Sequence, residues 1–153
     1  MIKTYFLILE TDTMNQLITK KTINELSYQI IGAAIEVHKI LGPGLLESNY
    51  EEALLYELKL RGLKTTSQQK IQIPYKDIIL DCDLRYDVLV EDLILVENKA
   101  TKDIHPIFVA TLLSYMKHLQ IPKGIMINFH VQNIFNEGQK TYVNNYFAAL
   151  PDE

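Results

Sequence analysis

The hydrophobic positions in the first part of the chain repeat with the period of a helix. Across residues 21–41 the apolar side chains form one stripe, which predicts an amphipathic helix. The stripe consists of Leu26, Ile30, Ala33, Val37 and Leu41.

The segment Gly42-Pro43-Gly44 then predicts a sharp turn. A second helix is expected over residues 45–61, ended by Gly62 in the manner usual for a helix C-terminus. Its expected buried side carries Tyr50, Ala53, Leu54 and Leu58.

The rest of the chain alternates short apolar segments with polar turns, which predicts strands and one further long helix. The expected elements are a strand over residues 70–75, a turn over 77–83, a hairpin within 84–100, a helix over 106–119, a strand over 124–129 and a final helix within 132–153. Pro106 fits the first turn of the third helix. The strand over 124–129 is expected to run parallel to a neighbour, because the preceding helix can serve as the crossover that parallel pairing needs.

The alternation of apolar residues predicts how the hairpin strands pair. A three-residue loop at residues 91–93, an ordinary hairpin loop length, sets Val90 opposite Ile94 and Val88 opposite Val96. These apolar side chains then share one side of the sheet. A two-residue loop would shift the register by one and leave apolar residues on both sides. The register with the three-residue loop is therefore the one that we predict.

This register gathers charged side chains on the other side of the hairpin. Asp87 lies opposite Glu97, and Arg85 lies opposite Lys99, with opposed Cβ atoms about 5 Å apart. Opposed carboxylates repel unless a cation lies between them, and Mg²⁺ takes one or two protein carboxylates together with substrate phosphate oxygens. Lys99 could stabilise charge on a phosphate or orient an attacking water. The alternative is a surface ion-pair cluster of these four residues on a solvated face.

Composition limits the class of protein. With 153 residues and 48% hydrophobic content, the chain predicts one domain with enough apolar material for a core. The single cysteine, Cys82, excludes an internal disulfide framework and fits a reducing cytosol, so we expect a cytoplasmic protein. The apolar run at residues 5–9 is too short to cross a membrane. We expect residues 1–20 to form a poorly ordered extension and residues 21–150 a single domain, with Met14 as an alternative start.

Charge and missing motifs narrow the function further. A net charge of -4 argues mildly against a protein that coats nucleic acid nonspecifically. Lysine and arginine clusters could still follow a phosphate backbone, although such clusters are more often solvated faces. They are Lys59, Arg61 and Lys64; Lys99 and Lys102; and Lys117 and Lys123. The sequence has no glycine-rich phosphate loop, serine elbow or CxxC pair, which argues against nucleotide hydrolases, esterases and zinc fingers.

Two motifs in a fixed order carry a resemblance to a known group of enzymes. Asp87 followed by Glu97-Asn98-Lys99 after an apolar strand is similar to the D…(D/E)xK core of the PD-(D/E)XK nuclease superfamily. The upstream segment Gly44-Leu-Leu-Glu47-Ser-Asn-Tyr50 is similar to the GxxExxY signature of one small family within it. Further similar segments are residues 35–44, 85–90, 112–115 and 124–129. The resemblance spans about residues 23–135.

The resemblance implies an α/β fold with a restriction-endonuclease-like αβββαβ core, in which helices flank a mixed sheet. It implies a metal-dependent nuclease with Mg²⁺ or Mn²⁺ held by Glu47, Asp87 and Glu97, and with Lys99 as the catalytic lysine. The residues expected to contact substrate or to support these groups are Arg85, Tyr50, Thr111 and Tyr115. Many relatives carry glutamine where this chain has Thr111, so this helix cannot supply the same amide contact.

The sequence leaves several functions open. We expect a phosphodiesterase that acts on nucleic acid, with DNA as the expected substrate, and a homodimer is one assembly that the resemblance allows. One alternative is a catalytically silent module that keeps the nuclease fold and binds nucleic acid or a protein partner. Another is a metal-carboxylate enzyme for a small phosphorylated substrate. The sequence does not distinguish DNA from RNA, single from double strands, or internal from terminal cleavage.

Overall fold

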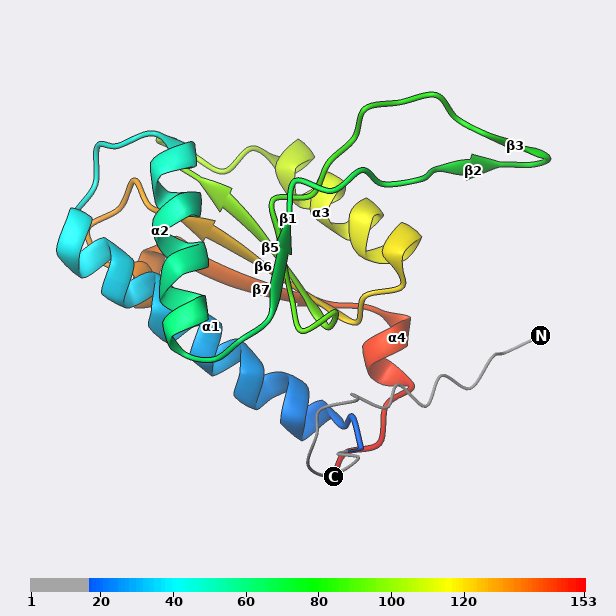
Figure 1. The fold of residues 1–153 in the computed structure, drawn as a ribbon, viewed down its shortest axis with the longest axis horizontal. Helices are drawn as coiled ribbons and strands as arrows, with labels where there is room; N and C mark the ends of the chain where they lie inside the picture. Colours follow the sequence, from blue (N-terminus) through cyan, green and yellow to red (C-terminus); the bar gives the residue numbers. More distant parts are fainter. Residues whose placement is uncertain (1–16) are drawn as a thin grey trace.

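The computed structural model of the chain describes residues 17–153. Their main sheet has five strands in the order β1-β4-β5-β6-β7, and a separate pair is formed by β2 and β3 (Figure 1). In the main sheet only β5 and β6 pair in parallel, and the other neighbours are antiparallel. The elements are α1 (Lys20–Leu41), α2 (Glu47–Leu60), β1 (Thr65–Ser67), β2 (Pro74–Tyr75), β3 (Ile78–Ile79), β4 (Val88–Val90), β5 (Ile94–Lys99), α3 (Pro106–Leu119), β6 (Lys123–Asn128), the π-helical turn η1 (Ile134–Gly138), β7 (Gln139–Val143) and α4 (Asn145–Ala148).

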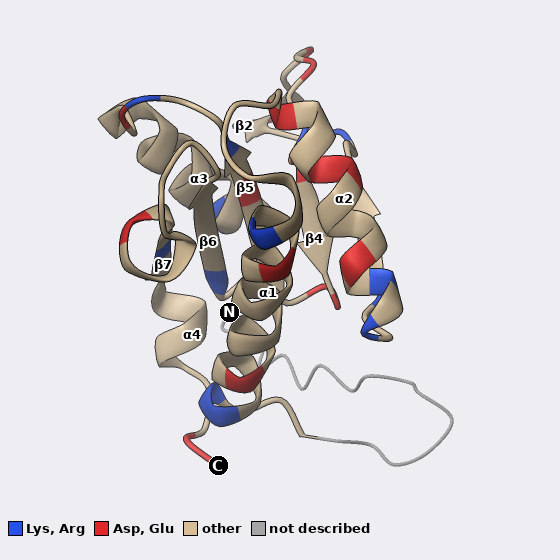
Figure 2. Cartoon of the chain, turned by 90° about the vertical axis from the view of Figure 1, so that its left-hand side faces the viewer, with Lys and Arg blue, Asp and Glu red and all other residues tan. Residues whose placement is uncertain are grey.

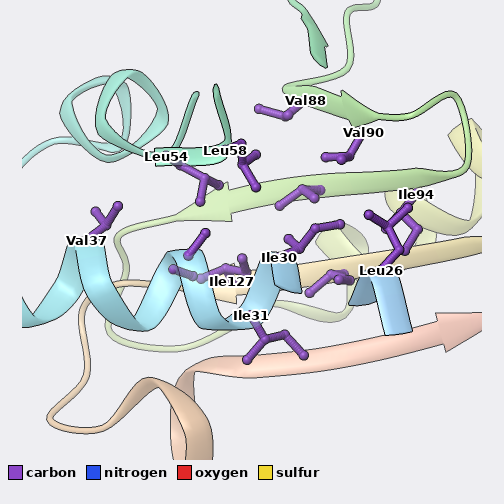
Figure 3. Close-up of a cluster of buried hydrophobic side chains, with 14 of the residues drawn as sticks. Leu26, Ile30, Ile31, Val37, Leu54, Leu58, Val88, Val90, Ile94 and Ile127 are labelled. Atoms are coloured by element: carbon purple, nitrogen blue, oxygen red, sulfur yellow. The ribbon is translucent and has the colours of Figure 1, made fainter. Parts of the chain in front are cut away.

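Two apolar cores lie on opposite faces of the sheet. On one face α1 and α2 pack against alternate residues of β4, β5 and β6, and Figure 3 shows Ile30, Leu54 and Val88 within this core. On the other face α3 packs through Leu112 and Met116. A Cβ atom at Gly124 of β6 would lie 2.6 Å from Sδ of Met116, so glycine permits this close approach of α3.

The predicted fold class is confirmed. The helices, the three antiparallel strands β1, β4 and β5, the crossover helix α3 and the parallel strand β6 follow the expected αβββαβ order. The register of the central hairpin is also confirmed, because Val88 pairs with Val96 and Val90 pairs with Ile94. Glu91 and Asp92 of its loop adopt positive φ values of 53° and 55°. The alternative register with a two-residue loop is therefore excluded.

Two predicted elements are wrong. The first strand of the sheet is β1, with the polar sequence Thr-Thr-Ser, whereas the expected strand over residues 70–75 belongs to a separate ribbon. The predicted final helix within residues 132–153 is replaced by η1, β7 and the four-residue α4. Both errors concern edge strands, whose exposed positions lack the apolar alternation of a buried strand.

The two ends of the described chain meet. Ile18 is buried in the core, and the side chain of Thr19 caps α1 by accepting a hydrogen bond from Thr22. The backbone N–H of Lys20 donates to the carbonyl of Pro151 over 2.8 Å. Residues 1–16 of the expected N-terminal extension, including the alternative start at Met14, lie outside the described residues. No helix among residues 17–153 is long and apolar enough to cross a membrane.

A two-stranded ribbon extends from the body of the domain between β1 and β4 (Figure 1). We call this ribbon, residues 70–85, the arm. Its base is closed by a bridge between Lys70 and Arg85, and its tip is formed by β2 and β3. The two-residue loop at the tip contains Lys76, whose φ is 50°. The arm leads directly into Asp87, so the same segment connects the ribbon with the charged side of the hairpin.

Candidate active site

The structure brings Asp87 and Glu97 together. Asp87 directly precedes β4 and Glu97 lies in β5, and the pairing of Val88 with Val96 makes them neighbours across the hairpin. The backbone N–H of Asn98 donates to Oδ2 of Asp87 over 2.8 Å, and that of Asp87 donates to Oε1 of Glu97 over 3.4 Å. The two carboxyl groups therefore share one space at the end of the hairpin.

The Glu97 side chain is in an unfavourable environment for a carboxylate. It is 7% exposed, and burial raises its pKa from 4.5 to about 8, with the negative charge of Asp87 as the next cause. The positive charge of Lys99 lowers the pKa, but less than these two effects raise it. A second cation in the site would stabilise the ionised form. The electrostatics of the pair are those of a site that gains from binding a cation.

Lys99 and Tyr115 border the same space. Lys99 ends β5, and its Nζ lies 4.3 Å from the ring centroid of Phe108 on α3. Tyr115, also on α3, is 8% exposed. Burial is the main cause that raises its pKa, followed by the negative charges of Glu97 and Asp87. The Tyr115 phenol is thus close enough to the carboxyl pair for the charges of both acids to act on it.

Arg85 does not join the carboxyl pair. Its guanidinium donates to Oδ1 of Asp83 over 3.1 Å and to the backbone carbonyl of Gln68 over 2.8 Å. Among residues 17–153, no ion pair connects Arg85 or Lys99 with Asp87 or Glu97. The alternative of a four-residue surface ion-pair cluster is therefore wrong for the described part of the chain.

Thr111 and Tyr50 are bound within the scaffold. The Thr111 hydroxyl donates to the carbonyl of Ile107, one turn earlier in α3. Tyr50 is fully buried and stacks on Phe129, with ring centroids 4.4 Å apart. The Tyr50 hydroxyl donates to the carbonyl of Gly42 and accepts from the N–H of Leu45. Tyr50 therefore holds the turn that precedes α2.

A carboxylate of α2 that the sequence analysis did not identify, that of Glu51, lies near the pair. The Gln68 amide donates to both carboxylate oxygens of Glu51, over 2.9 and 3.1 Å. The backbone N–H of Gln68 also donates to the carbonyl of Asp87 over 3.2 Å. Burial raises the pKa of Glu51, the Gln68 hydrogen bond lowers it, and the charges of Asp87 and Glu47 raise it further. Gln68 thus links Glu51 to Asp87.

Glu47 lies in the predicted second helix, but its side chain does not form a three-carboxylate group with the pair. It is the exposed first residue of α2, and Glu51 follows it by one helical turn on the same face. Acidic residues recur along this helix (Figure 2). Within residues 17–153, no three histidine, cysteine, aspartate or glutamate side chains are close enough to form a metal-binding group. Among these residues, neither Glu47 nor Glu51 therefore completes a three-carboxylate group with Asp87 and Glu97. The spacing of four residues from Glu47 is the sequence signal that could have identified Glu51.

The pair fits a hard divalent cation. Mg²⁺ binds through one or two protein carboxylates and completes its shell with waters and phosphate oxygens. Asp87 and Glu97 supply two such carboxylates, and Glu97 is a buried acid for which a cation offsets the cost of ionisation. The donor set contains oxygen atoms without thiolate or imidazole, which suits Mg²⁺ or Mn²⁺ rather than zinc.

Comparison with known proteins identifies the superfamily of the chain. The model of the PD-(D/E)XK nuclease superfamily matches residues 24–141. The chain belongs to the PD-(D/E)XK nuclease superfamily. The matched range contains Glu51, Asp87, Glu97 and Lys99, together with α2, β4 and β5. No curated protein and no solved structure matched the chain.

Membership of this superfamily agrees with the arrangement of the site. The superfamily consists of nucleases, whose substrates are nucleic acids and which generally use divalent metals. In this chain the residues that resemble the D…(D/E)xK core, Asp87, Glu97 and Lys99, lie in β5 and in the segment directly before β4. Their meeting depends on the antiparallel register of the two strands, because a shift by one residue would turn Asp87 and Glu97 to opposite faces.

Proposed function

We propose that this chain is a Mg²⁺- or Mn²⁺-dependent nuclease that hydrolyses phosphodiester bonds in nucleic acid, with DNA as the expected substrate. The observation that supports this proposal most strongly is the contact between Asp87 and the buried Glu97. Because fold and function separate readily, superfamily membership alone would not be enough. The motif from Gly44 to Tyr50 further supports membership of the GxxExxY family. We also propose a cytoplasmic location and a homodimer as the assembly.

In this proposal Asp87 and Glu97 hold the metal ion, with Glu51 or Glu47 as a further carboxylate from α2. When bound, the ion lowers the pKa of a coordinated water and neutralises charge on the scissile phosphate. Lys99 follows Glu97 by two residues on the same strand and therefore faces the same side of the sheet. Contact with the Phe108 ring restrains its ammonium group. That ammonium can stabilise negative charge on a phosphate oxygen and orient the attacking water.

Titration and cleavage assays together test the proposal. Calorimetric titration of the protein with Mn²⁺ is expected to show binding. Assays with single-stranded and duplex DNA and RNA, run in parallel with Mn²⁺, are expected to show cleavage of at least one substrate. Mn²⁺ binding without cleavage of any nucleic acid would favour an enzyme for a small phosphorylated substrate. Failure to bind Mn²⁺, combined with retained nucleic-acid binding, would favour the silent module.

The silent module gains support from two features of α3 and α2. The α3 helix carries Thr111 where many relatives have glutamine, and its hydroxyl is bonded within the helix. In addition, neither Glu47 nor Glu51 completes a three-carboxylate group with Asp87 and Glu97 among residues 17–153. Against this alternative stand the intact Asp87, Glu97 and Lys99, because a protein without catalysis is free to lose them.

The third carboxylate can be identified by comparing two neighbouring acids. We expect Glu51→Gln to weaken Mn²⁺ binding about 10- to 100-fold, the effect typical of residues that orient or support a metal site. Glu47→Gln is the matched control, because it removes the same charge from the same face of α2 one turn away. Calorimetric titration of both variants measures the difference. Stronger weakening by Glu47→Gln would assign the α2 carboxylate to Glu47 instead.

A further inference from the structure

The tip of the arm exposes apolar side chains on both of its faces. Tyr75 pairs with Ile78 and Pro74 pairs with Ile79. Directly opposed residues share a face, and neighbouring residues along a strand face opposite ways. One face therefore carries Tyr75 and Ile78, and the other carries Pro74 and Ile79. Tyr75 is 57% exposed, and the two isoleucines are each 59% exposed. A soluble domain rarely exposes such a group of apolar side chains unless it contacts another molecule.

The base of the arm is fixed to the domain. Ile71 is buried and Ile73 packs beside it against the α3 core, with Leu89 and Phe108 in the same cluster. The backbone N–H of Ile71 donates to the carbonyl of Leu84 over 2.8 Å, which joins the two strands above the base. Anchoring of this kind holds the tip in a defined direction, away from the body (Figure 1).

The arm also adjoins the candidate active site. Gln68, directly before the arm, donates its backbone N–H to the carbonyl of Asp87, and its side chain binds Glu51. Arg85, at the other end of the arm, donates to the carbonyl of Gln68. A polymer bound at Asp87 and Glu97 would therefore lie at the base of the arm and could reach its tip.

Charge argues against phosphate as the group that the tip contacts. The arm contains three basic and three acidic side chains, which are Lys70, Lys76, Arg85, Asp77, Asp81 and Asp83. Lys70 and Arg85 both pair with Asp83, and Nζ of Lys76 lies 5.4 Å from the ring centroid of Tyr75. The arm thus has no net charge to attract a phosphate backbone, and its contact surface is apolar and aromatic.

We propose that the arm tip is a nucleobase-contacting wedge, in which Tyr75 and Ile78 on one face and Pro74 and Ile79 on the other pack against substrate bases. This inference rests on the nucleic-acid substrate of the proposed function. A thin ribbon with apolar side chains on both faces fits between two planar bases, as apolar wedges fit between base steps. Aromatic side chains such as Tyr75 stack on bases of any sequence.

The wedge is tested by measuring nucleic-acid binding after substitution of an exposed tyrosine of the arm, with an exposed tyrosine outside the arm as the control. Fluorescence anisotropy is measured with single-stranded and duplex DNA and RNA, in EDTA to prevent metal-dependent cleavage. We expect Tyr75→Ala to weaken binding about tenfold and Tyr75→Trp to restore it. The salt dependence should stay unchanged, because no phosphate contact is lost. Tyr56→Ala is the control, since Tyr56 is 62% exposed on α2, and it should bind like wild type.

Several outcomes would overturn the wedge. Equal affinity of wild type, Tyr75→Ala and Tyr56→Ala would do so, as would a wild-type protein that binds none of the four nucleic acids. A change in sedimentation of Tyr75→Ala with unchanged nucleic-acid binding would assign the tip to a second copy of the chain instead. Loss of affinity in Tyr75→Ala, together with no Mn²⁺-dependent cleavage by wild type, would support the wedge and contradict the nuclease. The two proposals can therefore fail separately.

Discussion

Replacement of either Asp87 or Glu97 by alanine is expected to abolish metal-dependent cleavage while the fold survives. Each substitution removes one of the two carboxylates that meet at the end of the hairpin, and the remaining one binds a divalent ion weakly. We expect the cleavage rate to fall about 10³-fold or more, at least the effect of losing one electrostatic group at a transition state. The measurement is the cleavage rate with saturating Mn²⁺ on the best nucleic-acid substrate.

The control for this experiment is an acid of the same charge outside the site. Glu52 is exposed on α2, and we expect Glu52→Ala to cleave at the wild-type rate. Circular dichroism of all three variants checks that each one is folded. Wild-type rates in both Asp87→Ala and Glu97→Ala would exclude the proposed mechanism.

Stability in the absence of metal is expected to fall as the pH rises from about 4.5 to about 8. Glu97 has a pKa of about 8 in the folded protein, against 4.5 as its ordinary value. Between these values the folded state binds more protons than the unfolded state, so the free energy of unfolding decreases with rising pH. The loss amounts to several kcal/mol, since one pKa unit corresponds to about 1.4 kcal/mol. It would lower Tm by on the order of 10 °C.

The variant Glu97→Gln isolates this effect. Its amide resembles the protonated carboxyl group but cannot become charged. The Tm of the variant should therefore decrease much less than that of wild type as the pH rises. Above pH 8 it should be more stable than the metal-free wild type, and near pH 5 the two should be similar. Thermal unfolding in EDTA across this pH range measures the difference. Parallel Tm curves for the two proteins would contradict the raised pKa of Glu97. Glu52→Gln serves as the control.

The central hairpin could be predicted because local rules agree there. The alternation of apolar residues and the length of the loop both select the register that pairs Val88 with Val96. The proximity of Asp87 and Glu97 follows from that register alone, without knowledge of the rest of the fold. The third helix was predicted with its observed bounds, because Pro106 marks its first turn and an apolar stripe continues to Leu119.

The edge strands could not be predicted in the same way. β1 is three polar residues whose pairing with β4 is a long-range contact, and nothing in Thr-Thr-Ser distinguishes it from a loop. None of the five residues of β7 is fully buried, so the segment lacks the apolar alternation that would have predicted a strand instead of a helix. In both cases the partner strand, rather than the local sequence, determines the structure.

The position of Glu51 required the tertiary structure. Glu47 and Glu51 lie on one face of α2, so the helical period alone treats them alike. Their difference arises from Gln68, a residue beyond the second helix that adopts a positive φ of 52° and directs its amide to Glu51. The sequence motif predicts Glu47 as the ligand. The hydrogen bonds of Gln68, however, connect Glu51 with the backbone of Asp87.

The hairpin that carries the carboxyl pair also has a consequence for how the protein folds. Asp87 and Glu97 are ten positions apart in the chain, so closing the loop between them costs little entropy. Glu51 reaches Gln68 over a longer stretch and only after α2 has docked. Contacts between residues near in sequence generally form early. We therefore expect the two acids to meet early in folding, while both are still hydrated. A divalent ion bound at that stage would stabilise the hairpin before the rest of the chain packs against it.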